Sequence, residues 1–406
     1  MQSLMLDRFS AYGLLCRLGG CFFIQNLRKQ PFGNAKVAWK SFYTLYSASC
    51  FIFSFGCLFW FEAVTTHTDS RTSGQSDRFS NMLVQTQHAV VRVKVLLNFL
   101  SMITESGRLL DFFRKSAMFE WSSAFVSSKA YLRNGGGRLW SLLRRTLVIV
   151  TLAATYVMFM HFYVAQVANA MAVEWALPYK VIGSIAGLFI FLYESLCYVV
   201  LRCCSGVLLE YIRAQLTALE VCSESSAARA GSSQASRQLE TIRLNLCSIR
   251  ELTRGLNNMW EISLAGTGIG IVLMNCVVFY WVFHDGIFKR EVWVTLSYCT
   301  YSSFAFMELV YVSQALMDET QKLKNAVKAI RTPDPTGGYA EEYILQLRYL
   351  HESIDPKGMC FNGGGFFQLS KSLLVSMTGS IITFTVILVQ TSDELSSKMD
   401  TVYSTP

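Results

Sequence analysis

A stretch of nineteen residues near the end of the chain, from Ser372 to Gln390, carries no charged side chain. As an α-helix that rises about 1.5 Å per residue, it is long enough to cross a bilayer core of about 30 Å. One side of this helix is nevertheless polar. Residues at spacings of four, three, four and three form a single stripe, which consists of Ser376, Ser380, Thr383, Ile387 and Gln390. Lipid cannot satisfy such a stripe, so it needs other protein or water against it.

The polar stripe has two interpretations, which the sequence leaves open. Serine and threonine are common where membrane helices pack closely, because small side chains allow close approach and hydroxyls bond to their own backbone. Alternatively, the stripe lines a pore. Gln390 favours the pore slightly, because a primary amide has four hydrogen-bonding positions to satisfy. An apolar stripe lies beside the polar one and contains Met377, Ile381, Phe384 and Leu388.

The composition extends the membrane assignment to the whole chain. Of 406 residues, 52% are hydrophobic and only 16% are charged, which indicates a multi-pass helical membrane protein. The second predicted span is unusual, because Arg92 and Lys94 within it require shielding from lipid or a helix that continues into the cytosol. Residues 4–24 are expected to form an amphipathic helix at the membrane surface. Seven spans are predicted, at 42–64, 84–103, 146–168, 181–201, 262–283, 292–316 and 366–390.

The distribution of lysine and arginine predicts the orientation of these spans. Of 36 such residues, 26 lie before the first span or in the loops after the second, fourth and sixth spans. Only 6 lie in the other loops and the C-terminal tail, and the remaining four lie within or against spans. The positive-inside rule therefore predicts a cytosolic N-terminus and an extracellular C-terminus for a protein of the plasma membrane.

Helical patterning also continues outside the spans. Apolar residues recur at helical spacing through 205–220, 239–256, 320–330 and 339–354, so we expect long cytosolic extensions that form an anchor domain. Gly363-Gly364-Gly365 precedes the last span and is either a hinge or a plain flexible join. The first half of the predicted organisation is a cytosolic segment 1–36, spans one to four in 37–204, and cytosolic extensions 205–258 with a flexible loop at 222–236. Spans five and six in 259–316, anchor helices 317–362, the last span 363–391 and an extracellular tail 392–406 follow.

Several other functional classes fit the sequence poorly. The five histidines are scattered without metal-ligand spacing and no phosphate-binding loop is present, so we expect no enzyme, metal, cofactor or nucleic-acid partner. A G-protein-coupled chemoreceptor is the main alternative, but the charge count opposes an extracellular N-terminus, and Asp-Arg-Tyr and Asn-Pro-x-x-Tyr are missing from the relevant spans. A secondary transporter is a third option, although the chain shows neither internal repeats nor Gly/Pro-broken spans.

The last span resembles a known family. The series Gly365-Phe366-Phe367-Gln368-Leu369, Gly379 and Thr383-Phe384-x5-Gln390 is similar to the C-terminal signature of insect gustatory receptors. That signature has a Gly-Phe-Phe-x-Leu-Asp stretch, then Thr-Tyr, five apolar residues and Gln-Phe. This chain departs from it at three positions: Ser370 replaces Asp, Phe384 replaces Tyr, and Thr391 replaces a bulky apolar residue.

The resemblance implies a ligand-gated cation channel in which four subunits surround a central pore. The seventh helices of a homotetramer, or of a heteromer with related subunits, would line that pore. Its outer constriction would fall at Ile387, Gln390 and Thr391. Thr391 would either make closure by dewetting leakier or make it depend on Ile387. Ser376, Ser380 and Thr383 would be pore-facing hydroxyls.

The resemblance also implies a ligand pocket in the outer halves of the helices. Aromatic walls with a few polar tips are typical of small-molecule pockets, although tryptophan and tyrosine also belt membrane interfaces. Few carboxylates occur there, which favours an apolar compound, such as a bitter tastant, over a sugar. The candidate contacts are His161, Tyr163, Gln166, Tyr280, Trp281, Tyr298 and Tyr301, with His284 and Trp293 nearby.

Overall fold

A computed structural model shows an all-α protein, as expected. It describes residues 3–27, 35–72, 78–123, 125, 135–165, 168, 173–228, 233–284, 290–330 and 338–403. The helices are α1 (Leu4–Leu18), α2 (Phe42–Thr72), α3 (Arg78–Thr104), α4 (Ser106–Ser122), α5 (Gly135–Phe159), the π-helix η3 (Met160–Ala165), α7 (Val173–Ala228), α8 (Ser233–His284), α9 (Arg290–Ala329), α10 (Gly338–Ser353), the 3-10 helix η4 (Lys357–Met359) and α11 (Lys371–Tyr403). Two short antiparallel pairs join β1 (Ile24–Gln25) to β2 (Lys36–Val37) and β3 (Asn362–Gly363) to β4 (Phe367–Gln368).

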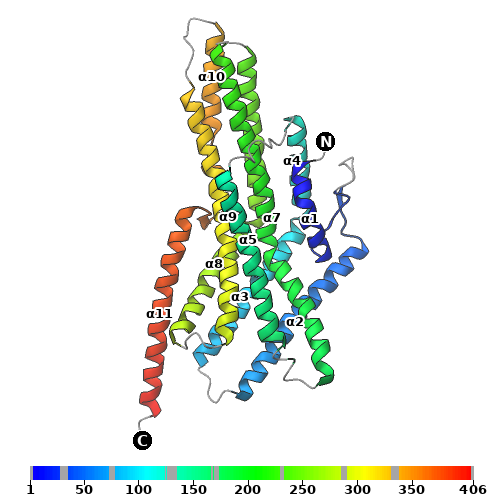
Figure 1. The fold of residues 1–406 in the computed structure, drawn as a ribbon, viewed down its shortest axis with the longest axis vertical. Helices are drawn as coiled ribbons and strands as arrows, with labels where there is room; N and C mark the ends of the chain where they lie inside the picture. The colour runs from blue at the N-terminus through cyan, green and yellow to red at the C-terminus, as the bar shows by residue number, and fades with distance from the viewer. Residues whose placement is uncertain are drawn as a thin grey trace.

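The long helices α7, α8 and α9 run through the bundle and continue beyond it (Figure 1). Their extended ends pack with α10 into a second helical region at one end of the molecule. The apolar patterning at 239–256 and 320–330 thus belongs to continuations of α8 and α9, while 339–354 corresponds to α10. The predicted loop at 222–236 is shorter than expected, because α7 continues to Ala228 and α8 begins at Ser233.

Four helices of the described chain are long and apolar enough to cross a membrane on composition alone. They contain Phe42–Trp60, Ala176–Ser223, Gln234–Phe283 and Lys371–Thr391. The other predicted spans coincide with α3, α5 and α9, which lie within the same bundle and contact α7, α8 or each other. The last span begins at Lys371 rather than at 366, and its helix continues to Tyr403 instead of giving way to a tail at 392.

The N-terminal helix α1 packs against α4 and α7, and Met5, Phe9 and Cys16 on its inner face are buried. The first backbone N–H groups of α1 have no partner within their own helix. They donate instead to α4, a helix that the sequence analysis did not predict. Glu120 of α4 accepts hydrogen bonds from the backbone nitrogens of Leu4 at 2.7 Å and Met5 at 3.0 Å. A carboxylate at a helix N-terminus also stabilises the helix dipole. The two helices are therefore joined by charge as well as by apolar contact.

A buried carboxylate joins three of the long helices. Glu308 of α9 accepts from Arg144 of α5 at 2.5 Å and from Arg202 of α7 at 2.8 Å, and its side chain is fully buried. Two cations on one carboxylate satisfy both of its oxygens. Sequence patterning alone did not identify this contact.

The three glycines before α11 form an ordered hairpin, neither a hinge nor a flexible join. Gly364 and Gly365 have φ values of +58° and +76°, a region that favours glycine, and they form the turn between β3 and β4. The ring of Phe367 lies against Gly363 and against Gly268 of α8, where a Cβ atom would approach the ring to 2.5 and 2.7 Å. Leu369 is fully buried. The hairpin thus fixes the start of α11 on α8.

Further hydrogen bonds hold the chain just before the hairpin. The backbone nitrogen of Asn362 donates to Asn257 of α8 at 2.8 Å, and that of Phe361 donates to Ser313 of α9 at 3.0 Å. Buried backbone groups are costly to leave unpaired. The hairpin is therefore anchored to two helices through polar as well as apolar contacts.

We expect Gly268→Ala to destabilise the protein, since its methyl group would displace Phe367, and overpacking costs about 1–3 kcal/mol. Gly255→Ala on the same helix is the matched control. No neighbouring atom lies within 4 Å of a Cβ there, so this change should stabilise by about 0.5–1 kcal/mol through helix propensity. Thermal unfolding of the detergent-solubilised variants measures both. Equal melting temperatures for the two variants would contradict the tight Phe367 site.

Candidate pore helix and buried polar site

Helix α11 is attached to the rest of the subunit along one side only. It packs chiefly against α8, with Leu374, Met377 and Leu388 partly buried and Thr385 buried. Only 6% of the residues in the most apolar stretch of α11 are buried within the subunit. In the most apolar stretch of α8, 61% are buried. Figure 1 shows α11 at the edge of the bundle, beyond α8 and α9. The subunit thus leaves most of its last helix uncovered.

The polar stripe lies on the uncovered side. Thr383 and Ile387 are each two residues from the buried Thr385, which at about 100° per residue places them about 160° around the helix from it. Gln390 and Ser376 are exposed as well, and Ser380 is half-buried. The stripe therefore points away from the helices of its own subunit, and packing within the subunit does not account for it.

Some hydroxyls of this helix are already satisfied as donors. Thr383 donates to the carbonyl of Gly379 at 3.0 Å, and Thr391 donates to the carbonyl of Ile387 at 2.8 Å. A hydroxyl that donates to its own helix keeps its oxygen lone pairs for another partner. The uncovered face thus presents acceptors, which suit cations better than anions.

The outer end of α11 packs on aromatic residues that the sequence analysis assigned to the ligand pocket. Tyr280 and Trp281 of α8 are buried in one cluster with Leu388 and Val389 of α11. Leu388 directly follows Ile387, and Val389 directly precedes Gln390. The aromatic pair therefore supports the segment that contains the predicted constriction.

A polar site is buried in the middle of the helical bundle. Lys94 of α3 pairs with Glu194 of α7 and donates to Ser302 of α9 at 2.8 Å. Tyr298 of α9 donates to the same carboxylate at 3.2 Å, and Asn98 donates to the Glu194 carbonyl at 2.8 Å. The predicted shielding of Lys94 from lipid is confirmed, because its side chain is only 8% exposed.

One atom of this site has no hydrogen-bond partner in the described part of the chain. The Oε2 oxygen of Glu194 is buried, and the neighbouring Oε1 oxygen accepts from both Lys94 and Tyr298. Buried carboxylate oxygens are ordinarily hydrogen-bonded. The hydroxyl of Tyr301 is a further neighbour that interacts with the same carboxylate, so this end of Glu194 adjoins a third polar group of α9.

Of the other predicted pocket residues, Tyr301 also adjoins this site, because its hydroxyl interacts with the Glu194 carboxylate while its ring packs with Val148 and Ala305. Trp293 and His161 are exposed. The side chains of Tyr163 and His284 lie outside the described part of the structure, as does Gln166. Their role as ligand contacts stays a prediction. Glu194 itself was missed, although a carboxylate inside an uninterrupted apolar run was a signal for it.

The bundle and its long apolar helices define a multi-pass helical membrane protein. The family model described as 7tm chemosensory receptor matches residues 10–394. The chain therefore belongs to the chemosensory receptor family, which includes insect receptors related to the odorant-receptor channels. A comparison with curated protein sequences gave no match.

Two solved structures share the fold. The olfactory receptor OR5 of the insect Machilis hrabei in complex with eugenol has a TM-score of 0.69 and 14% sequence identity. A second structure of OR5 from the same insect has a TM-score of 0.67 and 13% sequence identity. Each comparison covers 95% of this chain and 98% of the other. The seven-helix fold is thus shared along nearly the whole length.

We expect Lys94→Met and Glu194→Met each to destabilise the protein strongly, because either change leaves an unpaired buried charge, at a cost of about 3–5 kcal/mol. The double variant should be more stable than either single variant, since it removes both charges. Thermal unfolding of the four proteins gives the coupling.

The exposed pair Arg348–Glu352 provides the control for this cycle, because its side chains are 75% and 59% exposed. Exposed helical pairs of this kind contribute about 0.3–0.5 kcal/mol, so the same cycle should show little coupling there. Additive losses at Lys94 and Glu194 would mean that the two side chains do not depend on each other.

Proposed function

We propose that this protein is a gustatory receptor that acts as a tastant-gated, non-selective cation channel of the plasma membrane. The observation that carries this proposal is α11, whose polar stripe is turned away from its own subunit. A polar stripe on a membrane helix requires protein or water beside it, and a second copy of the same helix across a central axis provides both. In a homotetramer, or in a heteromer with related receptors, four such stripes surround one path.

The composition of the stripe suits weak passage of hydrated cations. Hydroxyl oxygens at Ser376, Ser380 and Thr383 offer acceptors without a fixed charge, which binds cations only weakly. Towards the outer end, Ile387 interrupts the polar series before Gln390 and Thr391. A ring of Ile387 side chains would close the path by dewetting, and a ring of Gln390 amides would restore hydrogen-bonding groups beyond it.

Contacts at the outer end of α11 provide a route from ligand to gate. Tyr280 and Trp281 belong to the cluster against which Leu388 and Val389, beside the proposed constriction, are packed. A ligand that repositions the outer part of α8 therefore changes the support of Ile387. Small shifts in packed elements produce discrete rearrangements, because cores do not deform continuously.

The ligand itself is proposed to be an apolar small molecule, such as a bitter tastant. The similar receptor OR5 was solved with eugenol, which makes this compound a rational first probe. Tyr298, Tyr301 and the Glu194 carboxylate would supply the polar attachment point for such a ligand among the packed apolar residues around Tyr298. A ligand that donates a hydrogen bond fits that acceptor.

The pore proposal is tested by substituting cysteine along α11. We expect Ser376→Cys and Thr383→Cys channels to lose most of their whole-cell current when a membrane-impermeant cationic thiol reagent is applied, because both positions face the proposed pore. Ile382→Cys is the matched control. It is exposed but lies about 100° around the helix from Thr383, so its current should persist.

The recordings use cells in which G-protein signalling is blocked, with eugenol and a panel of bitter compounds as agonists. A fast cation current under the block supports the channel, whereas a response that the block abolishes would make the protein a G-protein-coupled receptor. Equal sensitivity of Ile382→Cys and Thr383→Cys to the reagent would remove the polar stripe from the pore wall.

We further expect Thr391→Phe to reduce the current that flows without ligand. A large apolar ring next to Gln390 would strengthen a gate that closes by dewetting, whereas threonine keeps water there. Surface-labelled protein normalises the current, and Thr391→Ser serves as the control of similar size and polarity. A leak current that Thr391→Phe leaves unchanged would mean that Thr391 takes no part in closure.

A further inference from the structure

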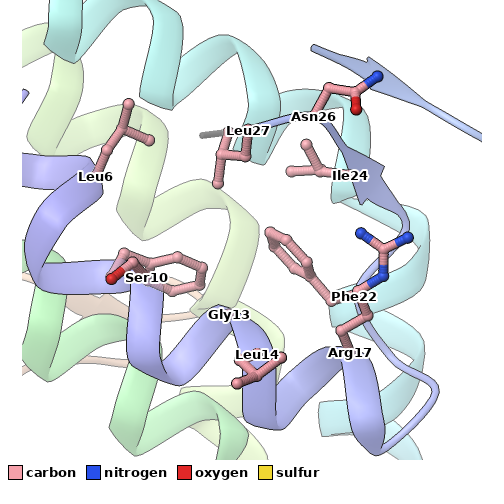
Figure 2. Close-up of a pocket in the computed structure, with 10 residues that line it drawn as sticks. Leu6, Ser10, Gly13, Leu14, Arg17, Phe22, Ile24, Asn26 and Leu27 are labelled. Atoms are coloured by element: carbon pink, nitrogen blue, oxygen red, sulfur yellow. The ribbon is translucent and has the colours of Figure 1, made fainter. Parts of the chain in front are cut away.

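A cavity of about 280 Å³ lies between α1 and the segment that carries β1 (Figure 2). Phe9 of α1 and Phe22, Ile24 and Leu27 of the β1 segment form its apolar walls. Its volume is slightly below the roughly 300–1,000 Å³ of typical small-molecule pockets. Gly13 forms part of the lining and contributes no side chain, which keeps the space open (Figure 2).

The Arg17 end of the cavity is tied to the start of α2, the first predicted span. Tyr43, in the first turn of α2, donates a hydrogen bond to the carbonyl of Arg17 at 2.8 Å. This bond ties the end of α1 to the start of the span. On the same part of α1, Leu14, Leu15 and Leu18 are each more than half exposed. Exposed leucines at a membrane boundary are expected to enter the lipid.

The electrostatics of the cavity favour an anion at its mouth. Arg17 is the charged residue among the described lining residues, and Figure 2 shows its guanidinium beside Phe22 at the edge of the cavity. The guanidinium lies 5.6 Å from the ring centre of Tyr43 and is exposed. Guanidinium groups are well suited to bind phosphate oxygens.

We propose that this cavity binds an anionic phospholipid of the adjacent membrane leaflet. One acyl chain occupies the cavity alongside Leu6, Leu14 and Leu27, over the floor formed by the touching rings of Phe9 and Phe22. Arg17 pairs with a headgroup of net negative charge, which phosphatidylcholine does not have. The apolar walls match a hydrocarbon chain, the single cation matches one net negative charge, and the exposed leucines bring the mouth to the lipid. The proposal concerns the N-terminal part of the chain and does not depend on the pore or on the tastant.

Native mass spectrometry of the purified full-length protein tests the proposal. Equal amounts of palmitoyl-oleoyl phosphatidylserine and phosphatidylcholine are added, and the ratio of bound species is measured. We expect the wild type to retain phosphatidylserine preferentially, and Arg17→Gln to reduce that preference at least threefold. Arg17→Lys should keep part of it. Because Arg17 is exposed, its replacement leaves the fold intact, which size-exclusion elution verifies.

Arg8→Gln is the matched control, since Arg8 lies about 180° around α1 from Arg17 and pairs with Glu210 of α7. It should leave the lipid preference unchanged. Ser10→Phe, which fills the cavity, should lower the binding of phosphatidylserine. Lipids that merely surround the protein contribute equally to all variants. A phosphatidylserine preference that is absent in the wild type, or equal in wild type and Arg17→Gln, would overturn the proposal.

Discussion

A hydrocarbon core offers no hydrogen-bond partner to polar side chains, and the helices of this protein meet that constraint in two ways. Lys94 and Glu194 meet it inside the subunit, where each charge satisfies the other and Tyr298 and Ser302 add neutral partners. Helix α11 does not meet it there, because its polar stripe is turned outward. The charges of the bundle thus have partners within the subunit, whereas the polar stripe of α11 faces away from the other helices of its subunit, which is the basis of the proposed pore.

The hairpin between β3 and β4 fixes the position of α11, although only one side of that helix is packed. A helix with one packed side is easily displaced unless its start is fixed. Phe367, held between Gly363 and Gly268, and the backbone bonds to Asn257 and Ser313 fix that start on α8 and α9. The outer part is supported by Trp281 and its neighbours in the same cluster. Motion at the outer end can thus occur about a fixed inner attachment.

The features that the sequence predicted correctly are those that depend on hydrophobic periodicity and on the distribution of charge. The long apolar runs located the spanning helices, and the charges in the second span correctly indicated a shielded helix. The sequence did not predict which carboxylates pair with the buried cations, because Glu194 lies 100 residues from Lys94 in the sequence and Glu308 lies 106 or more residues from its two arginine partners. Nor did it predict the hairpin, since a run of glycines is equally compatible with a free join and with a turn that needs positive φ. Both the carboxylate pairs and the hairpin depend on contacts between residues that are far apart in the sequence.

The position of the stripe relative to the packed face limits how α11 can function. Had the serines and threonines of the stripe faced α8, close helix packing would have explained them completely. They lie opposite Thr385 instead, and the exposed face also contains Ile387 between polar neighbours. A lipid-facing helix has no need for this alternation. A helix that alternately holds and excludes water does need it, because hydroxyls keep water in an open path while a ring of isoleucines expels it when the path narrows.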